Sequence, residues 1–147
     1  MISTMNYNQP QTGENIEMTG TRKSVILSTE CSGGHLTIIE EEISVGACST
    51  PHVSTREDKV IFVTDGKFIL FAEGEKYEAE KGCNIFIPRG VLHNFKNAGT
   101  QTGKLLITIT PFGQENFLKD LCLSVKVFGK DPAVMRDVAK RNGVVLA

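Results

Sequence analysis

The sequence has no long hydrophobic run, no block of like charge and almost no net charge. Apolar runs such as residues 60–63 and 105–107 are strand-sized, far below the roughly 20 residues that cross a bilayer. Sixteen basic and seventeen acidic residues give a formal net charge of -1. The electrostatic signature of nucleic-acid or anionic-membrane binding is therefore missing, and we expect neither as a partner.

Closely spaced cysteine pairs are also absent. Cys31, Cys48, Cys83 and Cys122 are scattered, and 147 residues with 40% hydrophobic content can bury one core without disulfides. We expect free thiols, with a metal-ligand or nucleophilic thiol as the alternative. The first residues also lack the basic start and apolar centre of a secretory signal, which favours a cytoplasmic protein.

Helical periodicity is missing between residues 22 and 113. Short runs of β-forming residues alternate there with glycine-containing turns, which predicts an all-β antiparallel barrel or sandwich. Residues 1–21 are polar, without a periodic apolar pattern, and predict a flexible N-terminal arm. The predicted strands are residues 24–28, 35–45, 59–65, 67–73, 76–80, 84–89, 91–97 and 104–111.

Residues 114–147 have a helical period and predict two short C-terminal helices. Asp131 and Pro132 suit the N-cap and first position of the second helix, and Gly143 suits its C-terminal end. The helices are expected to cover the barrel or a subunit interface. Their apolar stripes are Phe117, Leu118, Leu121 and Cys122, and then Val134, Met135, Val138 and Ala139.

His93 lies in a short β-run that follows a turn containing Pro88 and Gly90. Val91 and Phe95 have the same strand parity as His93, so the three side chains are expected to face one side. If that side is the interior of the barrel, an imidazole points into an apolar pocket.

This spacing resembles the second cupin motif, G-x5-P-x-G-x2-H-x3-N, and the first motif, G-x5-H-x-H-x4-E-x6-G, fits upstream in part. The resemblance covers roughly residues 33–111, and the helical tail is also similar to that of small single-domain cupins related to quercetin dioxygenases. It implies a double-stranded β-helix of the jelly-roll type with a ligand site inside the barrel. The matching residues are Gly82, Pro88, Gly90, His93 and Asn97, and then Gly46, His52 and Gly66.

Two metal-ligand positions of the family are replaced. In metal-bearing cupins three histidines and one glutamate bind the ion, whereas this chain has Ser54 and Lys59 at two of those positions. An ammonium at ~4 Å from a divalent cation costs on the order of several kcal/mol. His52 and His93 are therefore expected to hold a divalent transition metal (Zn, Fe, Mn or Ni) weakly, and no cofactor is certain.

A carboxylate from elsewhere could complete the metal site. Asp58 is adjacent to Lys59, but a one-residue offset places it on the opposite face unless a bulge intervenes. Glu41 shares its parity with Ile39 and Ile43, although it belongs to an acidic run that is more typical of an exposed edge.

The expected pocket combines polar residues at motif positions with apolar residues of matching parity. Phe68 or Ile69 is expected to add to this lining, whereas His35 is interpreted as a structural residue. The predicted lining is His52, Ser54, Lys59, Ile61, Val63, Val91, His93 and Phe95.

These residues favour a barrel that binds a small polar or anionic molecule, because Lys59 and two imidazoles can donate to a carboxylate or phenolate. One alternative is a metal-dependent, quercetinase-like dioxygenase with a weak two-histidine site. Another is a metal-free isomerase or epimerase with a histidine base. Whether the chain is an enzyme stays open. Exposed strand edges and apolar helices favour a homodimer.

Overall fold

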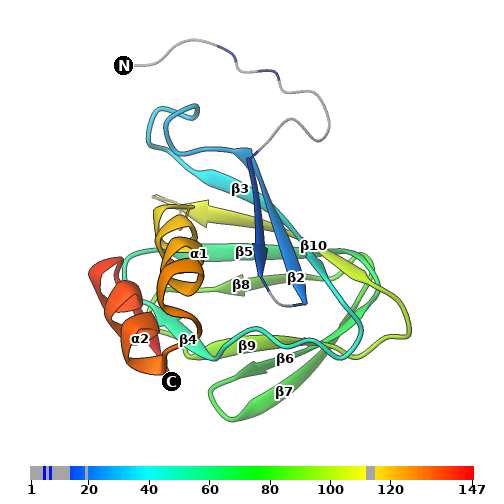
Figure 1. The fold of residues 1–147 in the computed structure, drawn as a ribbon. Coiled ribbons are helices and arrows are strands. Elements are labelled where there is room, and N and C mark those ends of the chain that lie inside the picture. Colours follow the sequence, from blue (N-terminus) through cyan, green and yellow to red (C-terminus); the bar gives the residue numbers. More distant parts are fainter. Residues whose placement is uncertain (1–4, 6, 8–13, 19, 112–114) are drawn as a thin grey trace.

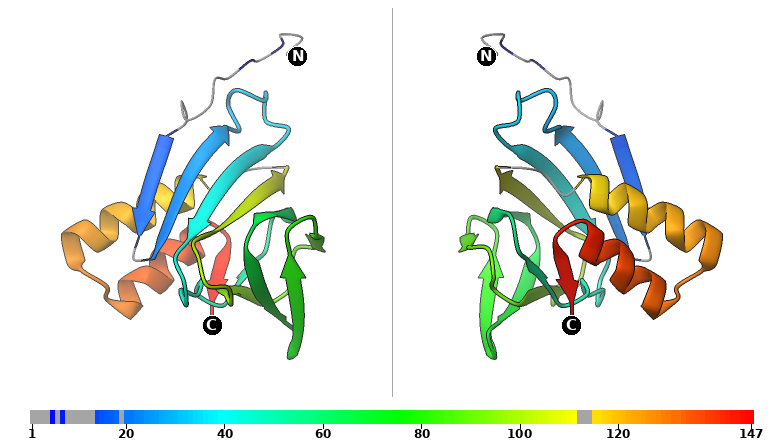
Figure 2. Two further views of the ribbon diagram at one scale, coloured as in Figure 1. Left: turned by 90° about the vertical axis from the view of Figure 1, so that its right-hand side faces the viewer. Right: turned by 90° about the vertical axis from the view of Figure 1, so that its left-hand side faces the viewer.

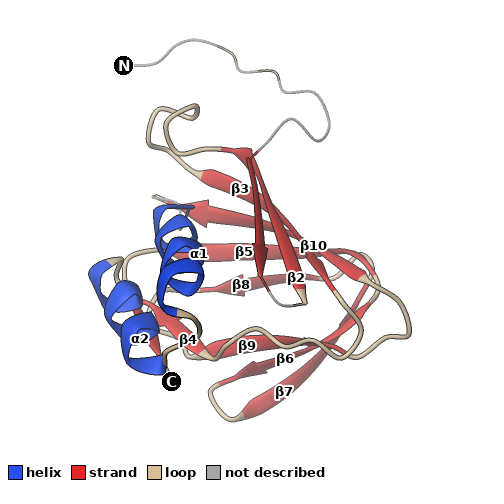
Figure 3. Ribbon diagram, viewed as in Figure 1, coloured by secondary structure: helices blue, strands red, loops and turns tan. Residues whose placement is uncertain are grey.

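The computed structural model describes residues 5, 7, 14–18, 20–111 and 115–147. Two antiparallel sheets form a barrel, and two helices lie at one end of it (Figure 1, Figure 3). The six-stranded sheet has the order β1 (Glu14–Met18), β2 (Thr21–Leu27), β3 (Thr37–Ile43), β10 (Gly103–Thr110), β5 (Asp58–Asp65) and β8 (Asn84–Ile87). The five-stranded sheet has the order β11 (Val144–Leu146), β4 (His52–Ser54), β9 (His93–Asn97), β6 (Lys67–Ala72) and β7 (Glu75–Glu80).

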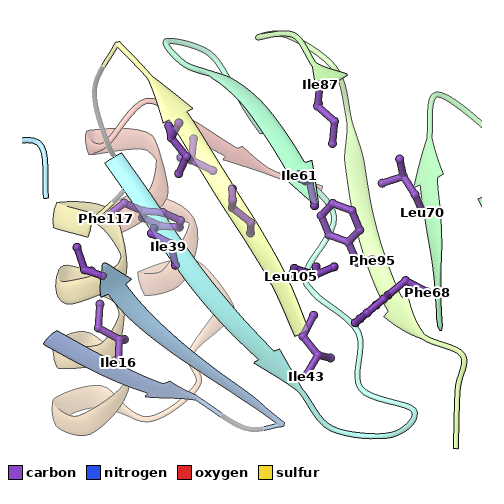
Figure 4. Close-up of a cluster of buried hydrophobic side chains, with 14 of the residues drawn as sticks. Ile16, Ile39, Ile43, Ile61, Phe68, Leu70, Ile87, Phe95, Leu105 and Phe117 are labelled. Carbon is purple, nitrogen blue, oxygen red and sulfur yellow. The ribbon is translucent and has the colours of Figure 1, made fainter. Parts of the chain in front are cut away.

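Alternating burial along the strands makes one core between the sheets. In β10, every second side chain is buried, and the strand pairs with β3 on one side and β5 on the other. Leu105 of β10, Ile61 of β5 and Phe95 of β9 lie together in this core (Figure 4). The predicted all-β jelly-roll fold with two C-terminal helices is confirmed.

Part of the predicted N-terminal arm forms a strand. β1 pairs with β2, and its Ile16 is buried in the core. A single inward-facing isoleucine in a polar segment gives no periodic signal, so the pattern did not reveal this strand. The rest of that arm, apart from residues 5, 7, 20 and 21, lies outside the described residues, as do residues 112–114 at the predicted end of the barrel.

Two three-residue strands were also not predicted. β11, inside the C-terminal extension, pairs with β4, so that the end of the chain joins the five-stranded sheet. Strands of this length contain too few residues to show an alternating pattern. Their consequence is that β4, which carries His52, is fixed between β11 and β9.

The helices α1 (Glu115–Phe128) and α2 (Pro132–Arg141) pack beside the barrel as two consecutive segments (Figure 2). The Asp131 side chain caps α2 by accepting a hydrogen bond from the backbone N–H of Ala133, and Pro132 occupies the first turn, as predicted. Phe117 of α1 is buried close to Ile39 of β3 (Figure 4). Neither helix, in the part of the chain that is described, has the length and apolarity needed to span a membrane.

Candidate functional site

Lys59 reaches from one sheet to a pair of histidines on the other. His52 of β4 and His93 of β9 are paired residues in the five-stranded sheet, with ring centroids 4.4 Å apart. Lys59 belongs to β5 in the six-stranded sheet. Its Nζ atom lies 2.9 Å from Nε2 of His52 and 3.3 Å from Nε2 of His93. The lysine amine therefore occupies the point where both imidazoles converge.

Backbone carbonyls fix the hydrogen-bonding roles of the two imidazoles. Nδ1 of His52 lies 2.8 Å from the carbonyl oxygen of Thr50, and Nδ1 of His93 lies 2.9 Å from that of Val91. A carbonyl oxygen accepts and cannot donate, so each Nδ1 carries the proton of a neutral ring. Each Nε2 is then an acceptor, and Lys59 donates one N–H to each.

Burial weakens the protonated form of Lys59. The side chain is buried, and this desolvation, helped by the charge of Lys23, lowers the Lys59 pKa to about 7. Glu41 and Glu57 act in the opposite direction because their carboxylates favour the ammonium. Near pH 7, ammonium and free amine are thus both populated.

The histidines are held neutral by the same surroundings. Burial, then the charge of Lys59, lowers the His93 pKa to about 4. Burial, Lys59 and His93 also place the pKa of His52 well below its ordinary value. Both rings are therefore uncharged acceptors at neutral pH, in agreement with the tautomers that the carbonyl contacts require.

Lys59 and His52 line a cavity of ≈ 360 Å³, a size that suits a small organic ligand. Polar groups from β2, β3, β4 and the loop before β4 line the cavity together with apolar side chains from the barrel and the helices. The polar lining is Thr21, Lys23, Glu41, Cys48, Ser49, Thr50, His52, Lys59 and Lys130. The apolar lining is Ile39, Ile61, Phe95, Ile107, Ile109, Phe117, Leu121, Met135 and Leu146.

Lys23 and Glu41 add a second charged group to the cavity. They are paired residues on β2 and β3, and Lys23 Nζ lies 3.6 Å from Oε1 of Glu41. Glu41 is 5% exposed, so it is a buried carboxylate rather than the edge residue that its acidic neighbours suggest. Lys23 was not predicted, because it lies outside both motifs and only its cross-strand pairing places it in the cavity.

Asp58 and Glu57 do not reach the cavity. The Asp58 side chain lies on the face of β5 opposite to that of Lys59, as strand parity predicts, and it accepts hydrogen bonds from Arg89. Glu57 is buried, and burial raises its pKa. Neither carboxylate completes a metal-ligand set with the histidines.

Of the predicted lining residues, the structure brings His52, Lys59, Ile61 and Phe95 to the cavity surface. His93 is 1% exposed and is not a lining residue, but it contacts Lys59, which lines the cavity. Five further candidates are not among the residues that line the cavity. They are Ser54 beside β11, Val63 in the core, Val91 ahead of β9, and Phe68 and Ile69 on β6.

The remaining expectations concern single side chains. His35 is exposed in the loop before β3 and does not line the cavity, and all four cysteines are free thiols. Cys48 is the one cysteine in the cavity lining. It lies with Ser49 and Thr50 in the segment that leads to His52.

The residues present do not fit the divalent metal that the resemblance implies. A metal bound by the histidines would need both Nε2 lone pairs, which accept from Lys59, and it would meet an ammonium at the same point. Among the described residues, no three His, Cys, Asp or Glu side chains form a group able to hold a metal. Lys59 thus takes the place that a metal ion would require.

A family model for the cupin domain matches residues 39–109, which span β3 to β10 and include Lys59 and both histidines. Solved cupin structures share the same fold. Residues 39–109 of this chain belong to the cupin superfamily. The resemblance inferred from the two motifs is therefore confirmed at the level of the superfamily.

Two relatives of this cupin show how far the similarity extends. The tetracenomycin polyketide synthase protein TcmJ of Streptomyces glaucescens is 26% identical over 70 residues, 48% of this chain and 47% of that protein. An uncharacterized protein of Aquifex aeolicus is 30% identical over 69 residues, 47% of this chain and 56% of that protein. The chain therefore spans about half the length of these curated relatives.

Solved structures extend the similarity over the barrel. KdgF from Halomonas sp. superimposes with a TM-score of 0.67 at 19% identity, covering 76% of this chain and 98% of that one. The polyketide cyclase RemF from Streptomyces resistomycificus gives a TM-score of 0.63 at 23% identity, covering 72% of this chain and 79% of that one. At these identities the similarity shows a common fold, which hosts many functions.

Proposed function

We propose that this cupin binds, without a metal, a small molecule that has an anionic oxygen at one end and an apolar body. The observation that carries the proposal is the position of Lys59 Nζ between two acceptor imidazoles, in a residue that lines the cavity. An ammonium has three N–H groups, and the histidines accept two. The third is left for a carboxylate, phenolate or enolate in the cavity.

The charges and the wall of the cavity support this ligand chemistry. Lys23 and Lys59 are two cations against the single carboxylate of Glu41, so the polar end has an excess of positive charge. Buried charge is stabilised by an opposite charge, which an anionic ligand would supply. The apolar lining, which includes Phe117 of α1 and Met135 of α2, would bury the apolar body.

The similarity to a polyketide cyclase and to a polyketide synthase protein is in keeping with such a ligand. Polyketide chains and their aromatic products carry ketone, enolate or phenolate oxygens on a largely apolar skeleton. We therefore propose phenolic and polycarbonyl compounds as the ligand class.

The test compares 2-naphthoate with its neutral methyl ester by isothermal titration calorimetry at pH 6.5. We expect the acid to bind at least tenfold more tightly than the ester, and Lys59→Met to remove this preference. Lys96→Met, at an exposed position of β9, is the matched control and should leave both affinities unchanged. Equal affinity for acid and ester, or a preference that survives in Lys59→Met, would overturn the proposal.

A second candidate function is metal-free proton transfer, as in an isomerase, epimerase or cyclase. The observation that favours it is the Lys59 pKa of about 7, which lets the amine act as acid or base near neutral pH. Solvent-deuterium exchange at the α-carbon of a 1,3-diketone, followed by NMR, tests this function. Wild-type rates equal to those of Lys59→Met would exclude it.

A dioxygenase is the third reading, and it needs a metal that the lysine opposes. Metal analysis of protein purified without chelators tests it, and we expect less than one tenth of an equivalent of metal per chain.

A cytoplasmic location and a homodimer remain predictions as well. The exposed side chains of Leu123, Val127 and Phe128 on α1 support self-association, which light scattering measures.

A further inference from the structure

The uncharged Lys59 amine has one lone pair that is available for bonding. When the amine is uncharged, Nζ has two N–H groups and one lone pair. Both N–H groups are taken by the Nε2 acceptors of His52 and His93, whose own protons are committed to backbone carbonyls. Among the described residues no further group is bonded to this nitrogen, so its lone pair is left over, on a residue that lines the cavity.

We propose that the Lys59 amine forms a covalent imine with a ketone or aldehyde that enters this cavity. The inference rests on the proposed function, because the same cavity must admit the carbonyl compound. It goes beyond binding, since the lysine becomes the nucleophile rather than the anchor of an anion. Desolvation and a neighbouring cation, here Lys23, are the conditions that activate a lysine for this chemistry.

The bond changes balance without an added reagent. The Nζ lone pair attacks the carbonyl carbon, the C=O π electrons move to oxygen, and one proton passes from nitrogen to that oxygen. The nitrogen lone pair then forms C=N as the C–O bond breaks, and the second N–H proton leaves with the oxygen as water. Amine and carbonyl thus give imine and water, with no change of oxidation state.

His52 is the group placed to carry the first proton. Its Nε2 lies 2.9 Å from Nζ, and unlike His93 it also lines the cavity where the oxygen would form. The apolar wall limits water beside the imine and so slows its hydrolysis. His52 thus transfers a proton between nitrogen and oxygen, and Lys59 is the nucleophile.

The test uses phenylpyruvate, which combines a ketone, a carboxylate and an apolar ring, and traps any imine with cyanoborohydride. Intact-protein mass spectrometry and peptide mapping then locate the adduct. We expect one adduct per chain at Lys59, formed at least tenfold faster than at any other lysine. Lys59→Arg should lose this adduct, whereas Lys67→Arg, at an exposed position of β6, should keep it. Adducts spread evenly over exposed lysines, or unchanged labelling of Lys59→Arg, would overturn the inference.

Two further measurements keep the outcome interpretable. Circular dichroism and thermal melting check that Lys59→Arg is folded, and Lys59→Met provides a second variant without the amine. His52→Gln should slow trapping at least fivefold at saturating phenylpyruvate, a condition that separates slower proton transfer from weaker binding. If 3-phenylpropanoate, which has no ketone, binds the wild type and phenylpyruvate gives no Lys59 adduct, the imine fails and the proposed binding function stands. If neither compound binds nor reacts, both fail.

Discussion

Lys23 and Glu41 are cross-strand partners whose charged groups meet 3.6 Å apart inside the cavity. Glu41 is buried and Lys23 is half-buried, and with the ammonium form of Lys59 the polar end of the cavity holds two cations and one carboxylate. Breaking a buried pair by removing one partner leaves the other charge without compensation. The charge balance at this end of the cavity therefore decides both stability and ligand preference.

Glu41→Gln should destabilise the protein and tighten anion binding at the same time. Without the carboxylate, Lys23 and Lys59 repel each other, and the cost is on the order of 3 kcal/mol. An anionic ligand would supply the missing charge, so the affinity for 2-naphthoate should rise several-fold. Urea unfolding and calorimetry measure the two effects. Glu42→Gln on the half-buried side of the same strand is the control, and equal effects in both variants would contradict this role of Glu41.

The stability of the protein should depend on pH through Lys59. The pKa of Lys59 is about 7 in the folded chain and about 10.4 in an unfolded one, so between these values the unfolded state binds more protons. The free energy of unfolding then rises with pH, and below pH about 7 the full cost of burying the ammonium applies. Lys59→Met lacks this dependence.

Urea unfolding of the wild type and Lys59→Met at pH 7, 8 and 9 measures the effect. The wild type should gain on the order of 2 kcal/mol relative to the variant across this range. Burial lowers the pKa values of both histidines, so their effect on the free energy of unfolding falls below pH 7. Parallel stability curves for the two proteins would show that Lys59 stays protonated in the fold.

The motifs could predict the barrel and the convergence of two histidines, because turn glycines and strand parity are local properties of the sequence. They could not predict that Lys59 bonds to both imidazoles, since this depends on the separation of the two sheets. Lys23 was out of reach for a similar reason, as only its register opposite Glu41 brings it inside. Val91 precedes β9, which begins at His93, and packs against the hydrophobic core.

The helices illustrate the same limit. The sequence shows their apolar stripes and the Asp131 cap, but it does not show which surface the helices pack against. Phe117 and Leu121 of α1 and Met135 of α2 turn out to line the cavity, so the extension builds part of the site. A period of 3.6 residues identifies a buried face but not what it is buried against.

Lys59→Glu should create a stronger metal site than the wild type offers. The substitution removes the ammonium that competes for both Nε2 atoms and adds a carboxylate beside two neutral imidazoles, giving three protein ligands. Zinc binding, followed by competition with a chromophoric chelator, should tighten at least a hundredfold relative to the wild type. Lys67→Glu, which adds the same charge at an exposed position, should not change it. Failure of Lys59→Glu to bind zinc would mean that the histidines cannot turn their Nε2 atoms to a metal.

Asn97 should be a structural residue of the motif rather than a ligand-binding one. Its side chain is 1% exposed, donates to the carbonyl oxygens of Ile43 and Gln101, and accepts from the backbone N–H of Gly99, each at 2.9 Å. Asn97→Ala would leave these buried groups without partners, at roughly 1–3 kcal/mol for each. We expect a loss of about 3 kcal/mol in urea unfolding, with the affinity for 2-naphthoate unchanged in the folded fraction. Asn94→Ala, at a half-buried position of the same strand, should cost less than 1 kcal/mol. A large change in ligand affinity for Asn97→Ala would instead mean that this hydrogen-bonded corner controls the shape of the cavity, because it joins β9 to the end of β3 and to the loop before β10.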